Sequence, residues 1–320
     1  MTKPHRSILS VPGHVEKMQV KAARSTADVV MLDLEDSVPL AAKEAARKQV
    51  LQSLQTLEWQ GKTVTVRING LDSAFAYRDL LEIAEGAGEK LDALVVPKVN
   101  HPGDLHFVDR MLDGIEQAMG LPRPIGIEAS IETARGLAGV RAIAQASPRV
   151  QTLVFGIADY SASVGARLAS VSGHGEQETD IYPGHRWHFA ISRMVMAAKA
   201  NGLLAIDAPY GNFKDPDGLK RAALMACSLG CDGKWAIHPS QIDTINQVFS
   251  PARDDILRAA KVLEAAREAQ KQGRGAIAVD GSMVDQATVR LARQLYAQAR
   301  HLGLIDSGDI QPEELEPDEI

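Results

Sequence analysis

The 320-residue chain contains only two cysteines, few aromatic residues and no long apolar run. Cys227 and Cys231 match neither the spacing of a metal site nor a disulfide framework, so we expect two reduced thiols that pack as small apolar side chains. No apolar stretch approaches the roughly 20 residues that a membrane-spanning helix needs. The N-terminus also lacks the apolar core of a signal peptide. These absences predict a cytoplasmic protein without a membrane partner.

The chain also lacks an excess of positive charge. Its 35 lysine and arginine residues against 41 aspartate and glutamate residues give a net charge of −6. Such a chain has no general affinity for phosphate backbones, which argues against a nucleic acid partner, although a local basic patch for a nucleotide-like ligand stays compatible with it. With 45% hydrophobic residues, it can bury one large core or two smaller ones.

What the sequence does contain is a repeated alternation of apolar runs and helix-like stretches. Eight short runs rich in Val, Ile and Leu are typical of buried strands, and Ala-rich or amphipathic stretches of helical period separate them. Eight such units favour a closed (β/α)8 barrel, the TIM barrel, over an open doubly wound sheet. The eight runs span residues 7–13, 29–36, 63–69, 93–98, 125–132, 152–159, 203–207 and 234–238.

Beyond the eighth run the chain changes character. We expect residues 1–250 to form the barrel, 251–305 a C-terminal helical arm or lid, and 306–320, which are acidic and contain proline, a flexible tail. The arm has helical segments at 254–272 and 287–303, joined by a strand-like piece with glycines on both sides. This piece indicates either a flap over an active site or a surface hairpin.

Several of the predicted strands end in charged residues, and the carboxyl ends of barrel strands share one mouth. Glu132 and Asp159 follow neighbouring strands. Two converging carboxylates suit a hard divalent cation such as Mg²⁺, whose remaining ligands are water and substrate oxygens. Each residue taken alone is more typical of a helix N-terminus. As a pair they predict a metal site.

Arg67 lies within the otherwise apolar strand TVTVRIN, where a cation must pair with an anion or face the mouth. One interpretation is an ion pair with a barrel carboxylate. The other is a donor to a substrate oxygen that gains negative charge during the reaction. Both interpretations place the guanidinium beside an anion.

Three acids close the run VVMLDLED. Strand alternation puts Asp33 and Glu35 on one face and Asp36 on the other. Such acids can hold metal-bound waters, or they can neutralise Lys98, which ends the run ALVVPK. Three acids within four residues exceed what a helix cap requires.

Three further residues at the ends of runs are candidates for contacts with the substrate. Lys98 can instead form a salt bridge, and Asp207, which ends LLAID, can instead cap a turn. His238, which ends KWAIH, can instead be a hydrogen-bonded core imidazole. The residue types alone leave both interpretations open for each.

The motifs RSILSVPG, LDLED, VRING, VPKV, IEASIETARG, FGIADYSAS, IDAPYGNF, GKWAIHP and VDGSMVD occur in this order along nearly the whole chain. The set resembles the citrate lyase β-subunit/HpcH–HpaI aldolase superfamily, and within it the malyl-CoA, β-methylmalyl-CoA and citramalyl-CoA lyases. The resemblance implies a TIM barrel enzyme that depends on Mg²⁺, with Mn²⁺ as the alternative. Such an enzyme makes or breaks a carbon–carbon bond between an acyl-CoA and a small 2-oxo acid.

The resemblance also implies roles for residues of the barrel. Glu132 of the IET motif and Asp159 of GIADY would hold the metal ion. Arg67 of VRING would bind the thioester or enolate oxygen as a catalytic group. Glu35 and Asp36 of LDLED would complete the catalytic set from the outer shell of the metal.

Other implied roles concern the arm and the CoA moiety. Asp285 of SMVD would act as the catalytic acid or base in the site of a neighbouring subunit, which implies a homotrimer or homohexamer. Arg6 and Lys17 match basic positions that contact CoA phosphates in such enzymes. One departure is Ser10, because the family often has an aromatic residue before its Pro-Gly turn.

The substrate that the resemblance implies first is (3S)-malyl-CoA, which is cleaved to acetyl-CoA and glyoxylate. β-Methylmalyl-CoA and (S)-citramalyl-CoA are close alternatives, because one methyl group in a pocket discriminates by only about 1–3 kcal/mol. Further alternatives are a malyl-CoA thioesterase, an aldolase for free 2-oxo acids, and a citrate lyase β subunit that acts on an acyl carrier protein. A barrel that serves only as a scaffold is the non-enzymatic alternative.

Overall fold

The computed structural model describes residues 3–59, 61–166, 186–272, 277–279 and 281–306. It divides into two compact units, Met1–Phe249 and Ser250–Ile320. Residues 307–320 of the predicted acidic tail and the first residues of the strand-like piece in the arm lie outside the described residues. Within the described part of the chain, no helix combines the length and the apolarity needed to cross a membrane.

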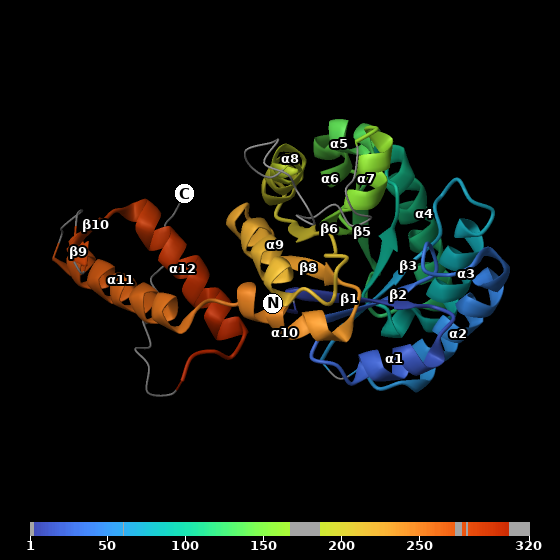
Figure 1. Ribbon diagram of the computed structural model, residues 1–320, viewed down its shortest axis with the longest axis horizontal. Coiled ribbons are helices and arrows are strands. Elements are labelled where there is room, and N and C mark those ends of the chain that lie inside the picture. The colour runs from blue at the N-terminus through green and yellow to red at the C-terminus, as the bar shows by residue number, and fades with distance from the viewer. Residues whose placement is uncertain (1–2, 60, 167–185, 273–276, 280, 307–320) are drawn as a thin grey trace. The chain divides into compact units, whose positions relative to one another are not determined.

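Eight parallel strands of the first unit close into a barrel in the order of the sequence (Figure 1). The last strand returns to the first, with Lys234 opposite Ser7. The predicted TIM barrel is therefore confirmed. The strands are β1 (Ser7–Pro12), β2 (Val29–Asp33), β3 (Thr63–Arg67), β4 (Ala93–Val96), β5 (Gly126–Ile131), β6 (Val150–Phe155), β7 (Leu204–Asp207) and β8 (Gly233–Ala236).

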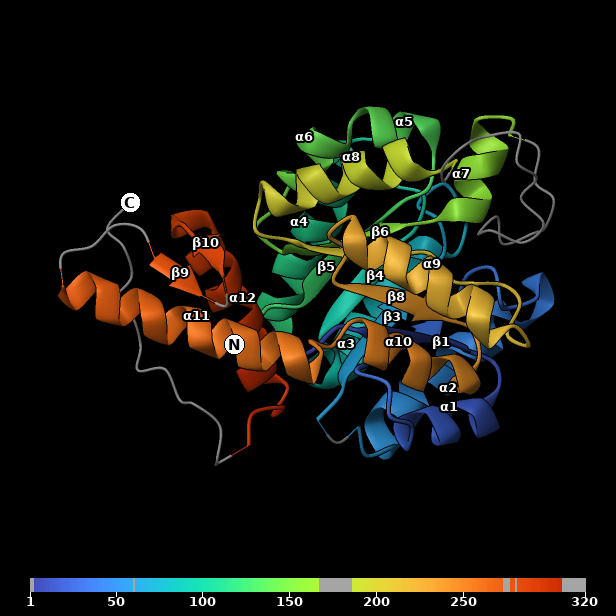
Figure 2. The same ribbon diagram turned by 60° about the vertical axis from the view of Figure 1, so that its left-hand side comes forward.

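Helices follow the strands and surround the barrel (Figures 1 and 2). Local sequence signals set their ends: α4 begins with a proline and stops at Gly120, which has the left-handed φ of 62°. After β5, Gly139 separates two short helices instead of continuing one long helix. The helices are α1 (Glu16–Ala23), α2 (Lys43–Thr56), α3 (Ala76–Ala87), α4 (Pro102–Met119), α5 (Ala134–Ala138), α6 (Val140–Ala144), α7 (Ile157–Ser163), α8 (His188–Lys199), α9 (Pro216–Ser228) and α10 (Ile242–Val248), with 3-10 turns at Leu40–Ala42, Gly88–Lys90 and Pro239–Gln241.

The barrel has two apolar layers because successive strand residues face opposite sides. The larger layer lies between strands and helices and includes Val64 and Val66 of β3. The smaller layer fills the barrel centre and consists of Ile8, Val29, Met31, Val95, Val154, Ile206 and Trp235. Since Val64 and Val66 face the helices, Arg67 faces inward, as does Glu132 at the end of β5.

The centre of the barrel also holds a carboxyl group that plays no part in the cavity described below. Glu128 of β5 is buried, and its Oε2 has no hydrogen-bond partner among the described residues. Burial, together with the charge of Asp92, raises the pKa of Glu128 from 4.5 to about 7. The folded protein therefore holds this carboxyl group in its neutral form below neutral pH.

We expect Glu128→Gln to change how stability depends on pH. The pKa of Glu128 is higher in the folded state than in the unfolded state, so its favourable contribution is complete below about 4.5 and is lost as the pH rises through about 7. The stability of the Gln variant relative to wild type should rise by about 2–3 kcal/mol between pH 5 and pH 8. Urea unfolding at both pH values measures this difference, and parallel pH profiles of the two proteins would contradict it.

Asp207 and Lys234 form a buried ion pair between neighbouring strands β7 and β8. Lys234 Nζ donates to Asp207 Oδ2 at 2.5 Å and to the carbonyl oxygen of Ala208 at 2.6 Å. Both side chains are fully buried. Because Ile206 and Trp235 belong to the central layer, Asp207 and Lys234 point to the opposite side, toward the helices.

Lys234→Met is expected to lower the free energy of unfolding by about 3–5 kcal/mol, because it leaves a buried carboxylate without its lysine. The double variant Asp207→Leu/Lys234→Met should recover most of this loss, since an apolar pair can replace a buried ion pair. Chemical denaturation of the three proteins measures both effects. A single variant as stable as wild type would show that the pair is energetically neutral.

The second unit is a helical pair with a small hairpin. Helices α11 (Arg253–Lys271) and α12 (Gln286–His301) lie side by side (Figures 1 and 2) and share an apolar core of their own. Strands β9 (Ile277–Val279) and β10 (Ser282–Val284) pair antiparallel between them. The strand-like piece of the arm thus forms a hairpin, and its action as a flap stays a prediction.

Candidate active site

A cavity of about 840 Å³ opens at the carboxyl ends of the strands. This is the end at which TIM barrels carry their reactive groups. Its walls come from every strand end except that of β4, and they combine acids, one arginine and one tryptophan. The lining residues are Ser10, Asp33, Asp36, Ser37, Arg67, Glu132, Gly156, Ile157, Ala158, Asp159, Pro209, Gly211, Asn212, Trp235 and Ile237.

Arg67 is fixed at the cavity wall by Asp33. Its Nε and Nη2 each donate to one oxygen of Asp33 at 2.7 Å, and its Nη1 lies 3.0 Å from Glu35 Oε2. Burial opposes ionisation of Asp33, but the charge and hydrogen bonds of Arg67 lower its pKa to about 2. Asp33 thus engages two of the five guanidinium N–H groups, and Glu35 adds a close ionic contact. The ion pair expected as one interpretation is present, and the guanidinium also faces the cavity.

Trp235 supports the same guanidinium from β8. The Arg67 Cζ atom lies 5.5 Å from the centroid of the indole ring, within the range of a cation–π contact. Trp235 was not among the residues that the sequence singled out. Its place in the run KWAIH marks it as a strand residue, but only the closed barrel shows that it faces the centre while Ala236 faces the helices.

Glu132 is the buried carboxylate of the cavity. It packs against Gly156, where an added Cβ would lie 2.4 Å from the Cβ of Glu132, so only glycine fits opposite this side chain. Burial and the charges of Glu35 and Asp159 raise the pKa of Glu132 to about 7, although Arg67 and Lys98 oppose the shift. The positive charges of Arg67 and Lys98 therefore offset the burial of this carboxylate only in part.

Lys98 is held in a left-handed backbone conformation, with φ at 51°, which is uncommon for a residue other than glycine. Its backbone N–H donates to Glu132 Oε1 at 2.7 Å, and its Nζ donates to Glu35 Oε1 at 2.6 Å. Burial disfavours the charged form, but the hydrogen bond and charge of Glu35 raise the pKa of Lys98 above its usual value. The salt bridge predicted as one interpretation of Lys98 is thus present.

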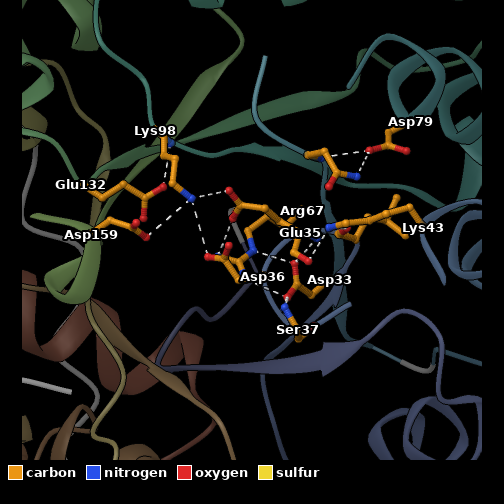
Figure 3. Close-up of polar contacts among 12 residues, drawn as sticks. Asp33, Glu35, Asp36, Ser37, Lys43, Arg67, Asp79, Lys98, Glu132 and Asp159 are labelled. Carbon is orange, nitrogen blue, oxygen red and sulfur yellow. Dashed lines mark hydrogen bonds and ion pairs between the residues drawn. The ribbon is translucent and has the colours of Figure 1, made fainter. Parts of the chain in front are cut away.

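Asp159 stands in the first turn of α7 and is partly exposed to the cavity. Its Oδ2 lies 3.6 Å from Lys98 Nζ. Figure 3 shows Glu132 and Asp159 together on one side of the Lys98 ammonium, with Glu35 and Asp36 on the other. The predicted pair of carboxylates is therefore brought together at one wall.

Asp36 also belongs to this cluster, contrary to the expectation that it faces away from Glu35. Its Oδ2 lies 3.8 Å from Arg67 Nη1 and 3.7 Å from Lys98 Nζ. The expectation was wrong because β2 ends at Asp33, so strand alternation no longer applies to the turn that carries both acids. Lys43 braces this turn, donating to the carbonyl oxygens of Leu34 and Glu35.

The charges of the cluster fit a divalent cation. Five carboxylates (Asp33, Glu35, Asp36, Glu132 and Asp159) face three cations (Lys43, Arg67 and Lys98), an excess of two negative charges when all are ionised. Oxygen ligands of this kind suit Mg²⁺. Within the described ranges, no group of three or more His, Cys, Asp or Glu side chains could hold a metal ion. Water and substrate oxygens would therefore complete the shell around Glu132 and Asp159.

Two residues that were predicted to contact the substrate lie away from the cavity. Arg6 precedes β1, so it sits at the amino ends of the strands, away from the cavity, and it pairs with Asp28 at 2.7 Å. Asp207 points toward the helices, in the ion pair with Lys234 described above. Both expectations failed for the same reason. That a residue adjoins a strand in the sequence does not tell at which end of the barrel it lies or which face of the sheet its side chain occupies.

His238 and Lys17 lie beyond the cavity wall. His238 is exposed rather than a core imidazole; its ring stacks on Phe213 at a centroid distance of 4.8 Å, and its Nδ1 lies 2.8 Å from Ser240 Oγ. Lys17 is exposed on the first turn of α1. Their contacts with a CoA thioester stay predictions. Ser10, the departure from the family pattern, lines the cavity.

Asp285 belongs to the second unit, where it is the N-cap of α12. Its Oδ1 accepts from the backbone N–H of Thr288 at 2.8 Å and from its hydroxyl at 2.9 Å. These hydrogen bonds lower the pKa of Asp285. Its action in the site of a neighbouring subunit stays a prediction.

Comparison with known proteins adds to this geometry. The family model described as HpcH/HpaI aldolase/citrate lyase matches residues 6–239, which include the whole barrel sheet. The chain belongs to the HpcH/HpaI aldolase/citrate lyase family. It is thus a carbon–carbon lyase, and the resemblance noted in its motifs is confirmed.

Three similar proteins span nearly all of this lyase. An L-malyl-CoA/β-methylmalyl-CoA lyase of Cereibacter sphaeroides is 39% identical over 93% of this chain and 95% of its own. A malyl-CoA/β-methylmalyl-CoA/citramalyl-CoA lyase of Chloroflexus aurantiacus is 35% identical over 95% and 90%. The crystal structure of CitE from Mycobacterium tuberculosis in complex with magnesium, acetoacetate and coenzyme A is 29% identical, with a TM-score of 0.75 over 93% of this chain and 99% of that one.

Proposed function

We propose that this lyase cleaves and forms the carbon–carbon bond of a hydroxyacyl-CoA, with (3S)-malyl-CoA as the substrate and acetyl-CoA and glyoxylate as the products. The observation that carries the proposal is the arrangement of Arg67 beside Glu132 and Asp159 in one cavity. The similarity to malyl-CoA lyases over nearly the full chain supports the choice of substrate. β-Methylmalyl-CoA is a second substrate of the same site.

Glu132 and Asp159 would hold Mg²⁺, because they supply buried and partly exposed carboxylate oxygens within a cluster that carries excess negative charge. The ion would supply Lewis-acid polarisation of the substrate's oxygens. The structure of CitE in complex with magnesium supports Mg²⁺ as the ion. Mn²⁺ satisfies the same oxygen ligands.

Arg67 would act on the thioester end of the substrate. Bond cleavage leaves an acyl-CoA enolate, whose oxygen carries the developing charge. N–H groups of Arg67 outside its bidentate pair with Asp33 would donate to that oxygen, and this pair keeps the guanidinium oriented at the cavity wall. Glu35 and Asp36 would act as outer partners that hold Lys98, Arg67 and metal-bound waters in position.

Asp285 would transfer the proton at the enolate carbon. In the cleavage direction it would protonate that carbon, and in the condensation direction it would remove a proton from the acyl-CoA, as microscopic reversibility requires. The family resemblance implies that a neighbouring subunit of a trimer or hexamer supplies Asp285 to the site.

The test is a panel of thioesters assayed with the purified protein. We expect malyl-CoA to yield glyoxylate and acetyl-CoA, β-methylmalyl-CoA to react more slowly, and chelation of divalent ions to abolish both reactions. Citramalyl-CoA and free malate serve as comparison substrates. Release of free CoA with malate would indicate a thioesterase, and cleavage of free hydroxy acids alone would contradict a CoA-dependent lyase.

A further inference from the structure

The Lys98 ammonium lies between Glu35 and Asp36 on one side and Asp159 on the other. Its Nζ lies 2.6 Å from Glu35 Oε1, 3.7 Å from Asp36 Oδ2 and 3.6 Å from Asp159 Oδ2 (Figure 3). Asp159 is also one of the two residues that we expect to ligate Mg²⁺. One carboxylate is therefore shared between a resident cation and the expected metal ion.

The backbone conformation of Lys98 limits the positions that its ammonium group can reach. The left-handed conformation of Lys98 directs its N–H to Glu132 Oε1, so the residue is anchored on one expected ligand while its side chain reaches the other. The side chain is about one-third exposed, and its shortest contact is with Glu35 rather than Asp159. It therefore has room to withdraw from Asp159 and still keep its hydrogen bond to Glu35.

We propose that Lys98 is a built-in counter-ion that compensates the carboxylates of the site before the metal ion binds and competes with it for Asp159. This inference rests on the Mg²⁺ site of the proposed function. Two cations near one carboxylate repel each other, so metal binding must displace the ammonium toward Glu35. Lys98 thus lowers the affinity for the metal ion and stabilises the protein without it.

The test is calorimetric titration of the full-length protein with Mg²⁺ alone. Lys98→Met keeps the length of the side chain and removes its charge, so we expect it to bind Mg²⁺ roughly ten-fold more tightly than wild type. Lys98→Arg keeps the charge and should bind close to the wild-type value. Lys199→Met, which removes a lysine paired with Asp232 outside the cavity, is the matched control and should leave the affinity unchanged.

The melting temperature provides a second readout that does not depend on activity. Without Mg²⁺, Lys98→Met should melt below wild type, and Mg²⁺ should raise its melting temperature by more than that of wild type. If this variant does not fold, Lys98→Gln removes the charge and keeps a donor for Glu35. Equal or weaker Mg²⁺ binding by the neutral variants, or no binding by any variant, would overturn the proposal.

These titrations contain no substrate, so their outcome is separate from that of the thioester panel. Tighter binding by the neutral variants supports the counter-ion role even in a protein that cleaves none of the tested thioesters. Conversely, an active lyase whose neutral variants bind Mg²⁺ like wild type would contradict that role and leave the proposed function standing.

Discussion

Replacing Arg67 with lysine is expected to lower turnover by about 100- to 1000-fold, the usual cost of losing an oriented donor to a developing oxyanion. Lysine keeps the positive charge, but it cannot bind both oxygens of Asp33 and still direct further N–H groups into the cavity. The KM for the thioester should change much less than kcat, because the interaction strengthens only as charge develops. Steady-state kinetics with the best substrate of the panel measures both constants.

The control for this prediction is the stability of the variant. Arg67→Ala leaves the fully buried Asp33 without its partner and should destabilise the protein by about 3–5 kcal/mol, which would confuse a loss of activity with a loss of fold. Arg67→Lys retains the opposite charge, so it should melt closer to wild type. A lysine variant that is folded and turns over at nearly the wild-type rate would show that the catalytic role is misassigned.

Replacing either expected metal ligand by its amide should have an effect at least as large. Glu132→Gln and Asp159→Asn are each expected to weaken Mg²⁺ binding by more than about 100-fold, because loss of even an outer partner of a metal typically costs 10- to 100-fold. Turnover should fall with the affinity and recover only in part at high Mg²⁺ concentrations. Titration with Mg²⁺ and the thioester assay measure the two effects.

Asp36→Asn is the matched control, because Asp36 belongs to the same cluster but is assigned to the outer shell. It should weaken Mg²⁺ binding less than either ligand variant does. Wild-type Mg²⁺ affinity in Glu132→Gln or Asp159→Asn would contradict the assignment. Equal losses in all three variants would indicate that only the total charge of the cluster matters.

Most of the barrel could be predicted from the sequence because its signals are local. A run of Val, Ile and Leu between helical stretches identifies a buried strand. Eight repeats of that unit favour a closed barrel over an open sheet. The same logic placed Arg67, Glu132 and Asp159 near one another, since each lies at or shortly after the carboxyl end of a barrel strand.

The failures of prediction share a physical origin. Asp207 ends a strand as Glu132 does, but it faces the helices, and its partner Lys234 comes from the next strand of the barrel. Arg6 adjoins a strand too, but at its amino end. The face of a side chain depends on how the strand is rotated in the barrel, and this rotation is set by pairing with segments distant in the sequence.

The sequence by itself therefore determined the fold, the family and the acidic and basic residues that gather at the mouth. Tertiary structure alone decided how they are paired: Asp33 rather than Glu35 holds Arg67 by two hydrogen bonds, Trp235 supports the guanidinium, and the left-handed backbone at Lys98 directs one residue to both Glu132 and Asp159. Local periodicity specifies which residues form a strand and where it ends. The partners of a buried charge depend on register and turn geometry, which only the closed barrel fixes.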